Sequence, residues 1–273
     1  MNARAIFAIV RKDLKVVSQN KNVIIPIVVI IVVFFIVFPL GISLAFTFFP
    51  QLADNLTTLE GYLTRMPASM QQAFLGYTIS QKFIVFALMY MLLPFFLMLP
   101  LMVASMIAAD SFAGEKERKT LEALLYTPTT DRELLVAKML SGWLAAIAVA
   151  LGGFVIYTIA VNAGAWSLMQ RIFFPNMMWL VMIIWVVPAL SALGVGVMVV
   201  ASARAQGFQD ANQTAGLVVL PIVALFYAQV AGALFLSTGI MLLIGLIVWL
   251  VTGALIWLGS QKFRRNRMLA GNA

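Results

Sequence analysis

Residues 83–109 read "FIVFALMYMLLPFFLMLPLMVASMIAA" and contain no charged side chain. A bilayer core about 30 Å thick needs roughly 20 apolar residues in a helix, so this stretch predicts a membrane-spanning helix. Six segments of the chain qualify in the same way: Val23–Phe49, Phe83–Ala109, Met139–Val161, Met177–Ala201, Leu217–Leu236 and Gly239–Gly259. The sequence therefore predicts an all-α polytopic integral membrane protein with six transmembrane helices, in which only "STG" separates the fifth span from the sixth.

The overall composition agrees with a membrane protein. Of the 273 residues, 63% are hydrophobic and 10% are charged, whereas a soluble domain carries about 25% charged residues. The net charge is +8, but the basic residues lie between apolar spans, which favours lipid contact over nucleic-acid binding. The chain contains no cysteine and no histidine. Disulfides, thiol nucleophiles, the usual zinc sites and imidazole catalysis are thereby excluded.

The distribution of lysine and arginine predicts the orientation in the membrane. With a cytoplasmic N-terminus, fifteen of these residues lie inside and three, Arg65, Lys82 and Arg171, lie outside. Basic residues concentrate on the cytoplasmic side of membrane proteins, so we expect both termini inside. The first apolar run is about twice as long as a signal-peptide core and has no small-x-small cleavage site after it, so we expect it to be a span. Prolines inside the spans each remove a backbone hydrogen bond that a neighbouring group must replace.

Residues 1–22 are predicted to contain a helix that lies in the membrane interface. On a helical wheel the basic residues share one face, and the apolar residues share the other. The basic face of such an elbow would meet lipid headgroups, and the elbow residues of interest are Arg11, Lys12, Asp13 and Lys15. Asp13 falls within the apolar arc. Two interpretations stay open: the helix end rotates so that Asp13 reaches water, or Asp13 pairs with a cation of the central loop.

Residues 110–138 form a charged island in this apolar chain and hold six of its ten acidic residues. Glu115 and Lys119, and likewise Arg118 and Glu122, have the i, i+4 spacing of opposite charges that stabilises an exposed helix by about 0.2–0.5 kcal/mol per pair. Leucines form a small apolar patch beside these charges, a pattern typical of a helix that inserts into a partner's groove. Pro128 ends this helix, and Thr130 and Glu133 have the spacing of a capping box that starts the next one.

The stretch "SFAGEKERKTLEALLYTPTTDRELLVAKML" (111–140) closely resembles the cytoplasmic loop of the ABC transporter type-2 permease family. The matching residues are Glu115, Glu117, Thr120, Leu121, Glu122, Leu124, Leu125, Thr127, Pro128 and Lys138. The resemblance extends more weakly to "RKDLK" (11–15), to "SARAQGFQDANQTAG" (202–216) and to the six-span layout. The short connection predicted between spans five and six departs from the family, whose members often have re-entrant helices there.

The resemblance implies a single transmembrane permease domain over residues 1–273, with a coupling helix in the cytoplasmic loop 110–138. It also implies a cytoplasmic ATPase partner, a second permease subunit (identical or different), ATP-driven export and a multi-pass location in a plasma membrane, with a prokaryotic cytoplasmic membrane expected. In such permeases the loop docks in a cleft of the ATPase, so Leu121, Leu124 and Leu125 would fill the groove. Glu115, Glu117 and Glu122 would pair with its rim.

The chain contains no G-x-x-x-x-G-K-[ST] loop for phosphates, so no nucleotide-binding domain is expected in it. ATP and magnesium are expected in the partner ATPase, and no catalytic residue, cofactor or metal is expected in this chain.

Other classes of membrane protein fit the sequence less well. A secondary carrier usually places ionisable residues inside its spans, and the six predicted spans contain no acidic or basic residue. A membrane-embedded enzyme would need clustered nucleophiles or metal ligands near the bilayer. A non-transporting membrane assembly scaffold stays open as an alternative. The sequence does not identify the cargo.

Overall fold

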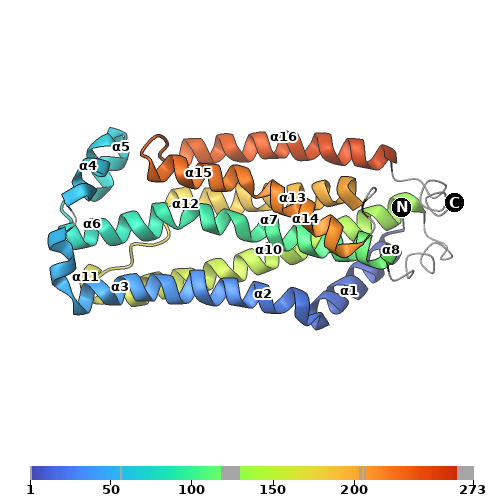
Figure 1. Ribbon diagram of the computed structural model, residues 1–273, viewed down its shortest axis with the longest axis horizontal. Helices are drawn as coiled ribbons and strands as arrows, with labels where there is room; N and C mark the ends of the chain where they lie inside the picture. The colour runs from blue at the N-terminus through green and yellow to red at the C-terminus, as the bar shows by residue number, and fades with distance from the viewer. Residues whose placement is uncertain (1, 56, 118–129, 203–204, 206, 263–273) are drawn as a thin grey trace.

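The computed structural model is an elongated bundle of helices that run along its long axis (Figure 1). It describes residues 2–55, 57–117, 130–202, 205 and 207–262, and these residues form helices, turns and loops without any strand. Short helices outside the spans occupy both ends of the bundle: α1 (Ala3–Gln19), η2 (Pro50–Asn55), α4 (Thr57–Arg65), α5 (Ala68–Gln71), η3 (Gln72–Phe74), α8 (Glu115–Glu117) and α11 (Trp166–Met169). The all-helical class predicted from the sequence is confirmed.

Six helices of the described residues are long and apolar enough to cross a membrane, as the sequence predicts. Each span consists of one helix or of consecutive segments: α2 (Lys21–Val32), η1 (Val33–Val37) and α3 (Phe38–Phe48); α6 (Ile79–Val85), η4 (Phe86–Met91), α7 (Leu93–Ala109) and η5 (Asp110–Gly114); α10 (Asp131–Gly164); α12 (Met177–Val181), η6 (Met182–Val186) and α13 (Val187–Ser202); α14 (Phe208–Val218) and α15 (Leu220–Val230); α16 (Thr238–Lys262). The second and third helices extend beyond the predicted apolar limits. Hydropathy marks where the bilayer ends, and a helix can continue past that point into polar sequence.

The connection between the fifth and sixth spans differs from the prediction. The fifth helix ends at Val230, six residues before the predicted Leu236, and α16 begins at Thr238. Gly232 adopts a left-handed φ of 71°, which ends a helix at low cost because glycine has no Cβ. The predicted boundary was wrong because residues 231–236 are as apolar as a span while the backbone has already turned. The connection, residues 231–237, contains no helix.

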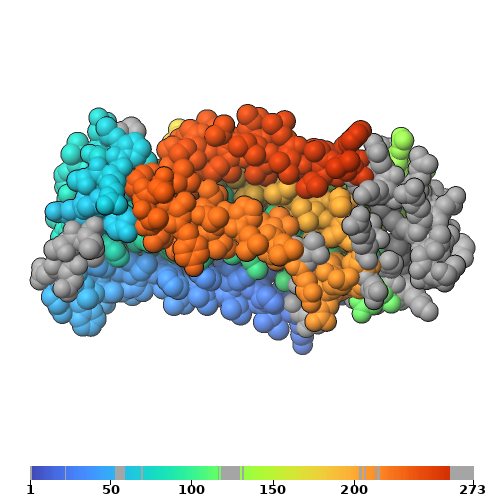
Figure 2. Space-filling view, turned by 45° about the horizontal axis from the view of Figure 1, so that its top comes forward, coloured from blue at the N-terminus to red at the C-terminus, as the bar shows by residue number. Residues whose placement is uncertain are grey.

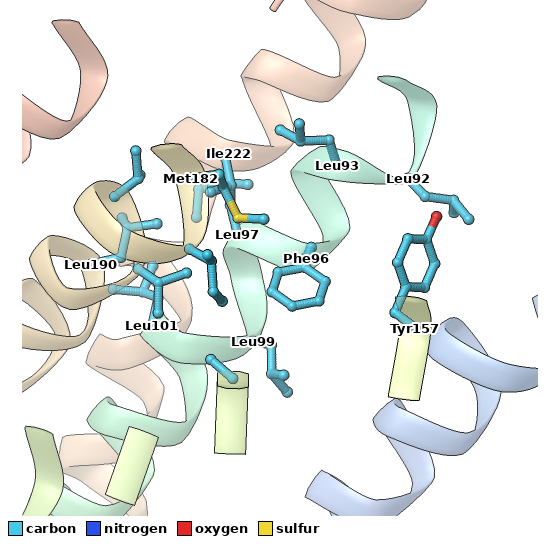
Figure 3. Packing of buried hydrophobic residues seen from close by; sticks show 14 of the residues in the cluster. Leu92, Leu93, Phe96, Leu97, Leu99, Leu101, Tyr157, Met182, Leu190 and Ile222 are labelled. Atoms are coloured by element: carbon cyan, nitrogen blue, oxygen red, sulfur yellow. The ribbon is translucent and has the colours of Figure 1, made fainter. Parts of the chain in front are cut away.

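The core of the bundle is built around α7, which packs against α13 and α10. In the close view of Figure 3, Phe96, Leu97 and Leu101 of this helix lie among side chains of the neighbouring helices. Gly194 of α13 permits close contact, because a Cβ at this position would lie 2.7 Å from the carbonyl oxygen of Leu101. Burial of apolar area and close packing of this kind hold the second and fourth spans at the centre of the protein.

The π-helical segment η4 precedes Pro94 and leaves backbone carbonyls to be satisfied by side chains. Proline has no N–H, so the i+5 donor that a π-helix would offer to the carbonyl of Met89 is missing. The indole Nε1 of Trp179 donates to this carbonyl at 2.9 Å. The hydroxyl of Tyr157 donates to the carbonyl of Leu88 at 2.5 Å. A side chain of a neighbouring helix thus supplies the donor that Pro94 lacks, and a second side chain donates to the adjacent Leu88 carbonyl.

Candidate functional site

The first helix, α1, is joined to the bundle by one narrow face. The side chain of Asn2 caps it by accepting from the N–H groups of Arg4 and Ala5. The buried residues of α1 are Val10, Asp13 and Val17, whose spacing places them on one side of a helix. This face packs against α10. Figure 1 shows α1 lying at an angle to the other helices, at the end of the bundle where both termini lie. Phe7 and Val16 are exposed, so the apolar arc of the wheel is wider than the face that contacts protein.

Asp13 is buried, with 5% of its surface exposed. Its Oδ2 atom accepts from the hydroxyl of Ser111 at 3.2 Å and from the hydroxyl of Ser141 at 3.4 Å. Its Oδ1 atom lies 3.4 Å from Nζ of the adjacent Lys12. The interpretation in which Asp13 reaches water is therefore wrong. Asp13 does meet the charged island, but through the Ser111 hydroxyl, and the cation that pairs with it among the described residues is Lys12.

Glu115 lies between two lysines that come from different helices. Its Oε1 atom is 2.9 Å from Nζ of Lys12 on α1, and its Oε2 atom is 2.5 Å from Nζ of Lys138 on α10. Lys138 has no exposed side-chain surface. Its ammonium also donates to the carbonyl oxygen of Ser111 at 2.6 Å and to the hydroxyl of Ser111 at 3.2 Å. A charge can be buried at tolerable cost only if it is paired and hydrogen-bonded, and the ammonium of Lys138 is both. We call Lys12, Asp13, Ser111, Glu115, Lys138 and Ser141 the charge cluster.

The charge cluster shifts the pKa values of two of its members. Burial raises the pKa of Glu115, but the charge and hydrogen bond of Lys138, and then those of Lys12, outweigh it, so this pKa lies below its ordinary value. Burial lowers the pKa of Lys12, but the hydrogen bond to Glu115 and the charges of Glu115 and Asp13 outweigh it, so this pKa is raised. Both groups are therefore held in their charged forms.

Glu133 connects the beginnings of α1 and α10. The predicted capping box is present: the Thr130 hydroxyl accepts from the N–H of Glu133, and Oε2 of Glu133 accepts from the N–H of Thr130 at 2.9 Å. The other carboxylate oxygen, Oε1, accepts from the backbone N–H of Asn2 at 2.5 Å. One carboxylate thus serves two helix starts.

Glu117 extends the contacts to the fifth span. Its Oε2 atom accepts from the backbone N–H of Phe208 at 2.9 Å, in the first turn of α14. The start of a helix has unpaired N–H groups and a positive partial charge, so a carboxylate is favourable there. The segment that ends the second span therefore contacts α1, α10 and α14 through Glu115 and Glu117.

A scan against protein families matches residues 7–262 to the model described as ABC-2 family transporter protein. The chain belongs to the ABC-2 transporter family. The resemblance found in the sequence is thereby confirmed, and it classes the chain as a multi-pass membrane protein and an ABC transporter permease. Members of the family associate with an ABC ATPase and lack an ATPase site of their own. No curated protein matches the chain significantly in sequence.

The structure brings part of the predicted ABC-2 site together. Lys12, Asp13, Glu115 and Lys138 lie in the charge cluster, and Glu117 lies beside α14. Arg11 and Lys15 are exposed on α1. The other predicted coupling residues lie outside the described residues: Thr120, Leu121, Glu122, Leu124, Leu125 and Pro128.

Sequence reasoning missed Ser111, Ser141 and the second role of Glu133. Ser141 follows Lys138 by three residues and therefore shares its helix face, which was a usable signal. Ser111 offered none, because its contact with Asp13 spans 98 residues of sequence. The described residues contain no group of three or more Asp and Glu placed to hold a metal ion.

Proposed function

We propose that this chain is the membrane-spanning permease subunit of an ATP-driven exporter, powered through residues 110–138 by a separate cytoplasmic ATPase. The observation that carries the proposal is the buried Glu115–Lys138 pair in a member of the ABC-2 family. This pair joins the segments that precede and follow residues 118–129 at one end of the bundle. A force applied to the loop would reach the second and third spans together.

Asp13 and Lys12 connect α1 to the same point. Because Lys12 shares Glu115 with Lys138, and Asp13 shares Ser111 with Lys138, a displacement of the loop ends cannot leave α1 unaffected. We infer that α1 is the interfacial elbow and moves with the coupling loop. Its exposed Phe7 and Val16 fit contact with lipid, and Arg11 and Lys15 fit contact with headgroups.

The orientation follows from the charge bias of the sequence. Figure 1 places α1, α8 and the C-terminal end of α16 at one end of the bundle, and α4, α5 and α11 at the other. By their place between the spans in the sequence, fifteen lysines and arginines fall on the side of both termini and three on the opposite side, which supports a cytoplasmic position for the first end. A prokaryotic cytoplasmic membrane is the proposed location.

The loop leucines Leu121, Leu124 and Leu125 are proposed to fill a groove of the ATPase, and Glu117 and Glu122 to meet its rim. Thr120 and Pro128 are proposed to delimit this coupling helix. ATP and magnesium would bind in the ATPase alone. A second permease subunit would complete the translocation path, and the exposed apolar side chains of α14 and α15, such as Leu217 and Tyr227, are available for such a contact.

The test is co-purification from the native membrane in mild detergent. We expect a stoichiometric partner with a phosphate-binding loop to accompany the wild-type chain, and Leu124→Asp with Leu125→Asp to release it while the permease stays inserted. Glu60→Gln, at the opposite end of the bundle, is the matched control and should retain the partner. Normal retention of the ATPase by the double variant would show that the docking surface is wrong. An intact permease without any ATPase would favour a carrier or a scaffold.

A further inference from the structure

A pocket of about 420 Å³ lies at the end of the bundle opposite to α1. Residues of α5, of η4, and from the beginnings of α12 and α16 line it. Figure 1 shows these helix starts close to α5, and in Figure 2 the segment after α15 lies against the α4–α5 region. The volume falls within the range of small-molecule sites, roughly 300–1,000 Å³. Met177 at its rim is 65% exposed, so the pocket reaches the surface.

Tyr90 provides the first indication of a ligand. It lines the pocket with 6% of its surface exposed, and its hydroxyl, which is not among the fully buried polar atoms, forms no hydrogen bond with a described residue. Buried tyrosine hydroxyls are normally hydrogen-bonded. Tyr157, in the same bundle, follows that rule through the carbonyl of Leu88. The hydroxyl of Tyr90 is therefore a donor available to an occupant of the pocket.

The backbone provides the second indication. The first turn of α16, a helix of 25 residues, lies at the pocket and contains no acidic residue. Ser237 satisfies one of its N–H groups, that of Ile240, at 3.4 Å. The fourth span also begins here, where Asn176 accepts from the N–H of Trp179 at 3.2 Å. Thr238 and Gly239 of the first turn of α16 line the pocket, so the positive partial charge of this helix start lies where it would stabilise an anionic group.

The rest of the lining is apolar and adaptable. Met70 and Met178 are buried thioether side chains, and Leu236 is completely buried beside them. Methionine has three rotatable bonds and a polarisable sulfur, so it adjusts to flexible apolar ligands. The pocket therefore combines donors for one anionic group with a lining that suits a hydrocarbon chain.

We propose that this pocket binds an amphiphile with an anionic head and an acyl chain. The head accepts from the Tyr90 hydroxyl and the first turn of α16, while the chain contacts Met70, Met178 and Leu236. An anionic membrane phospholipid and a free fatty acid share this chemistry. The site lies away from the charge cluster and does not depend on coupling to an ATPase.

The test uses the full chain in nanodiscs of phosphatidylcholine, with palmitic acid that carries a diazirine at the end of its chain. After photolysis, mass spectrometry of peptides should find saturable labelling near Met70, Met178 and Leu236. Oleate should compete, whereas oleyl alcohol and the methyl ester of the probe should be at least tenfold weaker, because they lack the charge. Addition of phosphatidylglycerol separates the two sources: displacement of the probe identifies a membrane phospholipid, and its persistence identifies a free acid.

Two variants make the result specific to the site. Gly239 lines the pocket, and a Cβ at this position would meet no atom within 4 Å. Gly239→Leu should therefore fill space without displacing protein and abolish the saturable labelling. Tyr90→Phe removes one donor to a charged acceptor and should weaken binding about tenfold. Gly253→Leu, on the same helix and equally open, is the matched control and should bind normally.

Two results would overturn the proposal. One is equal labelling by the acid and its methyl ester, which would show that no anionic group is recognised. The other is unchanged labelling in both Gly239→Leu and Tyr90→Phe.

Discussion

The two ends of this bundle treat buried polar groups in opposite ways. At the α1 end, Asp13, Glu115 and Lys138 are withdrawn from water, and each has partners on at least one other segment. At the other end, Tyr90 lines the pocket with 6% of its surface exposed, and its accessible hydroxyl forms no hydrogen bond with a described residue. A buried charge without a partner would cost several kcal/mol, whereas a hydroxyl that is accessible at a pocket carries little such cost.

This difference distinguishes the charge cluster, which holds helices together, from the pocket at Tyr90, which can bind a ligand. In the charge cluster the partners are already present, so the energy of the charges serves to hold α1, α7–η5 and α10 together. The Tyr90 hydroxyl has no partner among the described residues, so it can donate a hydrogen bond to a molecule that enters the pocket. The predictions below test this contrast, starting with the largest effect.

Lys138→Met should cause the largest loss of stability. It removes the buried ammonium that lies 2.5 Å from Glu115, and losing one partner of a buried ion pair costs about 3–5 kcal/mol. Thermal unfolding in detergent, followed by circular dichroism, would measure it. Lys138→Met combined with Glu115→Gln should recover much of the loss, because the carboxylate that has lost its buried cation is then neutral. Equal losses in the single and double variants would contradict the assigned pairing.

Protonation of Glu115 by acid should cause a slightly smaller loss of stability than Lys138→Met. The pKa of Glu115 in the folded protein lies below its ordinary 4.5. The carboxylate therefore stabilises the fold above about pH 4.5, and this contribution is lost as the pH falls through the folded pKa. The pKa of Lys12 is raised above 10.5, so its contribution is complete below that pH and is lost as the pH rises through the raised value.

The pH dependence is checked by unfolding temperatures across the pH range. Glu115→Gln should flatten the acid limb, and Lys12→Met should flatten the alkaline one. An acid limb that is identical in wild type and Glu115→Gln would assign the titration to another group.

The same chemical change at two tyrosines should have unequal effects. Tyr157→Phe leaves the carbonyl of Leu88 without its donor and should cost about 1–3 kcal/mol. Tyr90→Phe removes a hydroxyl without a protein partner and should change the stability of the lipid-free protein by less than about 0.5 kcal/mol. Unfolding of both variants in detergent, after removal of lipid, provides the comparison. A large loss in Tyr90→Phe would mean that this hydroxyl is structural.

Asp13→Asn should have the smallest effect within the charge cluster. The amide oxygen can still accept from Ser111 and Ser141, so only the 3.4 Å pairing with the half-exposed Lys12 is lost. We expect a loss of about 1 kcal/mol or less. Asp13→Leu removes both acceptors and should cost more. Lys15→Gln, on the exposed side of α1, is the control and should be neutral within about 0.5 kcal/mol.

The spans were predictable from the sequence because one physical variable, the length of an apolar run, determines them. The capping box of Thr130 and Glu133 was predictable because it is local. The end of α15 was not, since Gly232 turns a backbone whose side chains are still apolar. Asp13 was recognisable as a misfit, but its partners lie 98 and 128 residues away, beyond any periodicity. The pocket was not predictable, because the ends of several distant segments form it.

The contact between Asp13 and Ser141 also imposes an order on the docking of helices during synthesis. A ribosome adds roughly 5–20 residues per second, so Ser141 is synthesised about 6–26 s after Asp13, given the 128 residues between them. During that interval the Ser141 hydroxyl that later donates to Asp13 has not been made, so the Asp13 carboxylate is expected to stay hydrated at the membrane surface. The first helix made can therefore complete its contacts only after the start of the third span has been made.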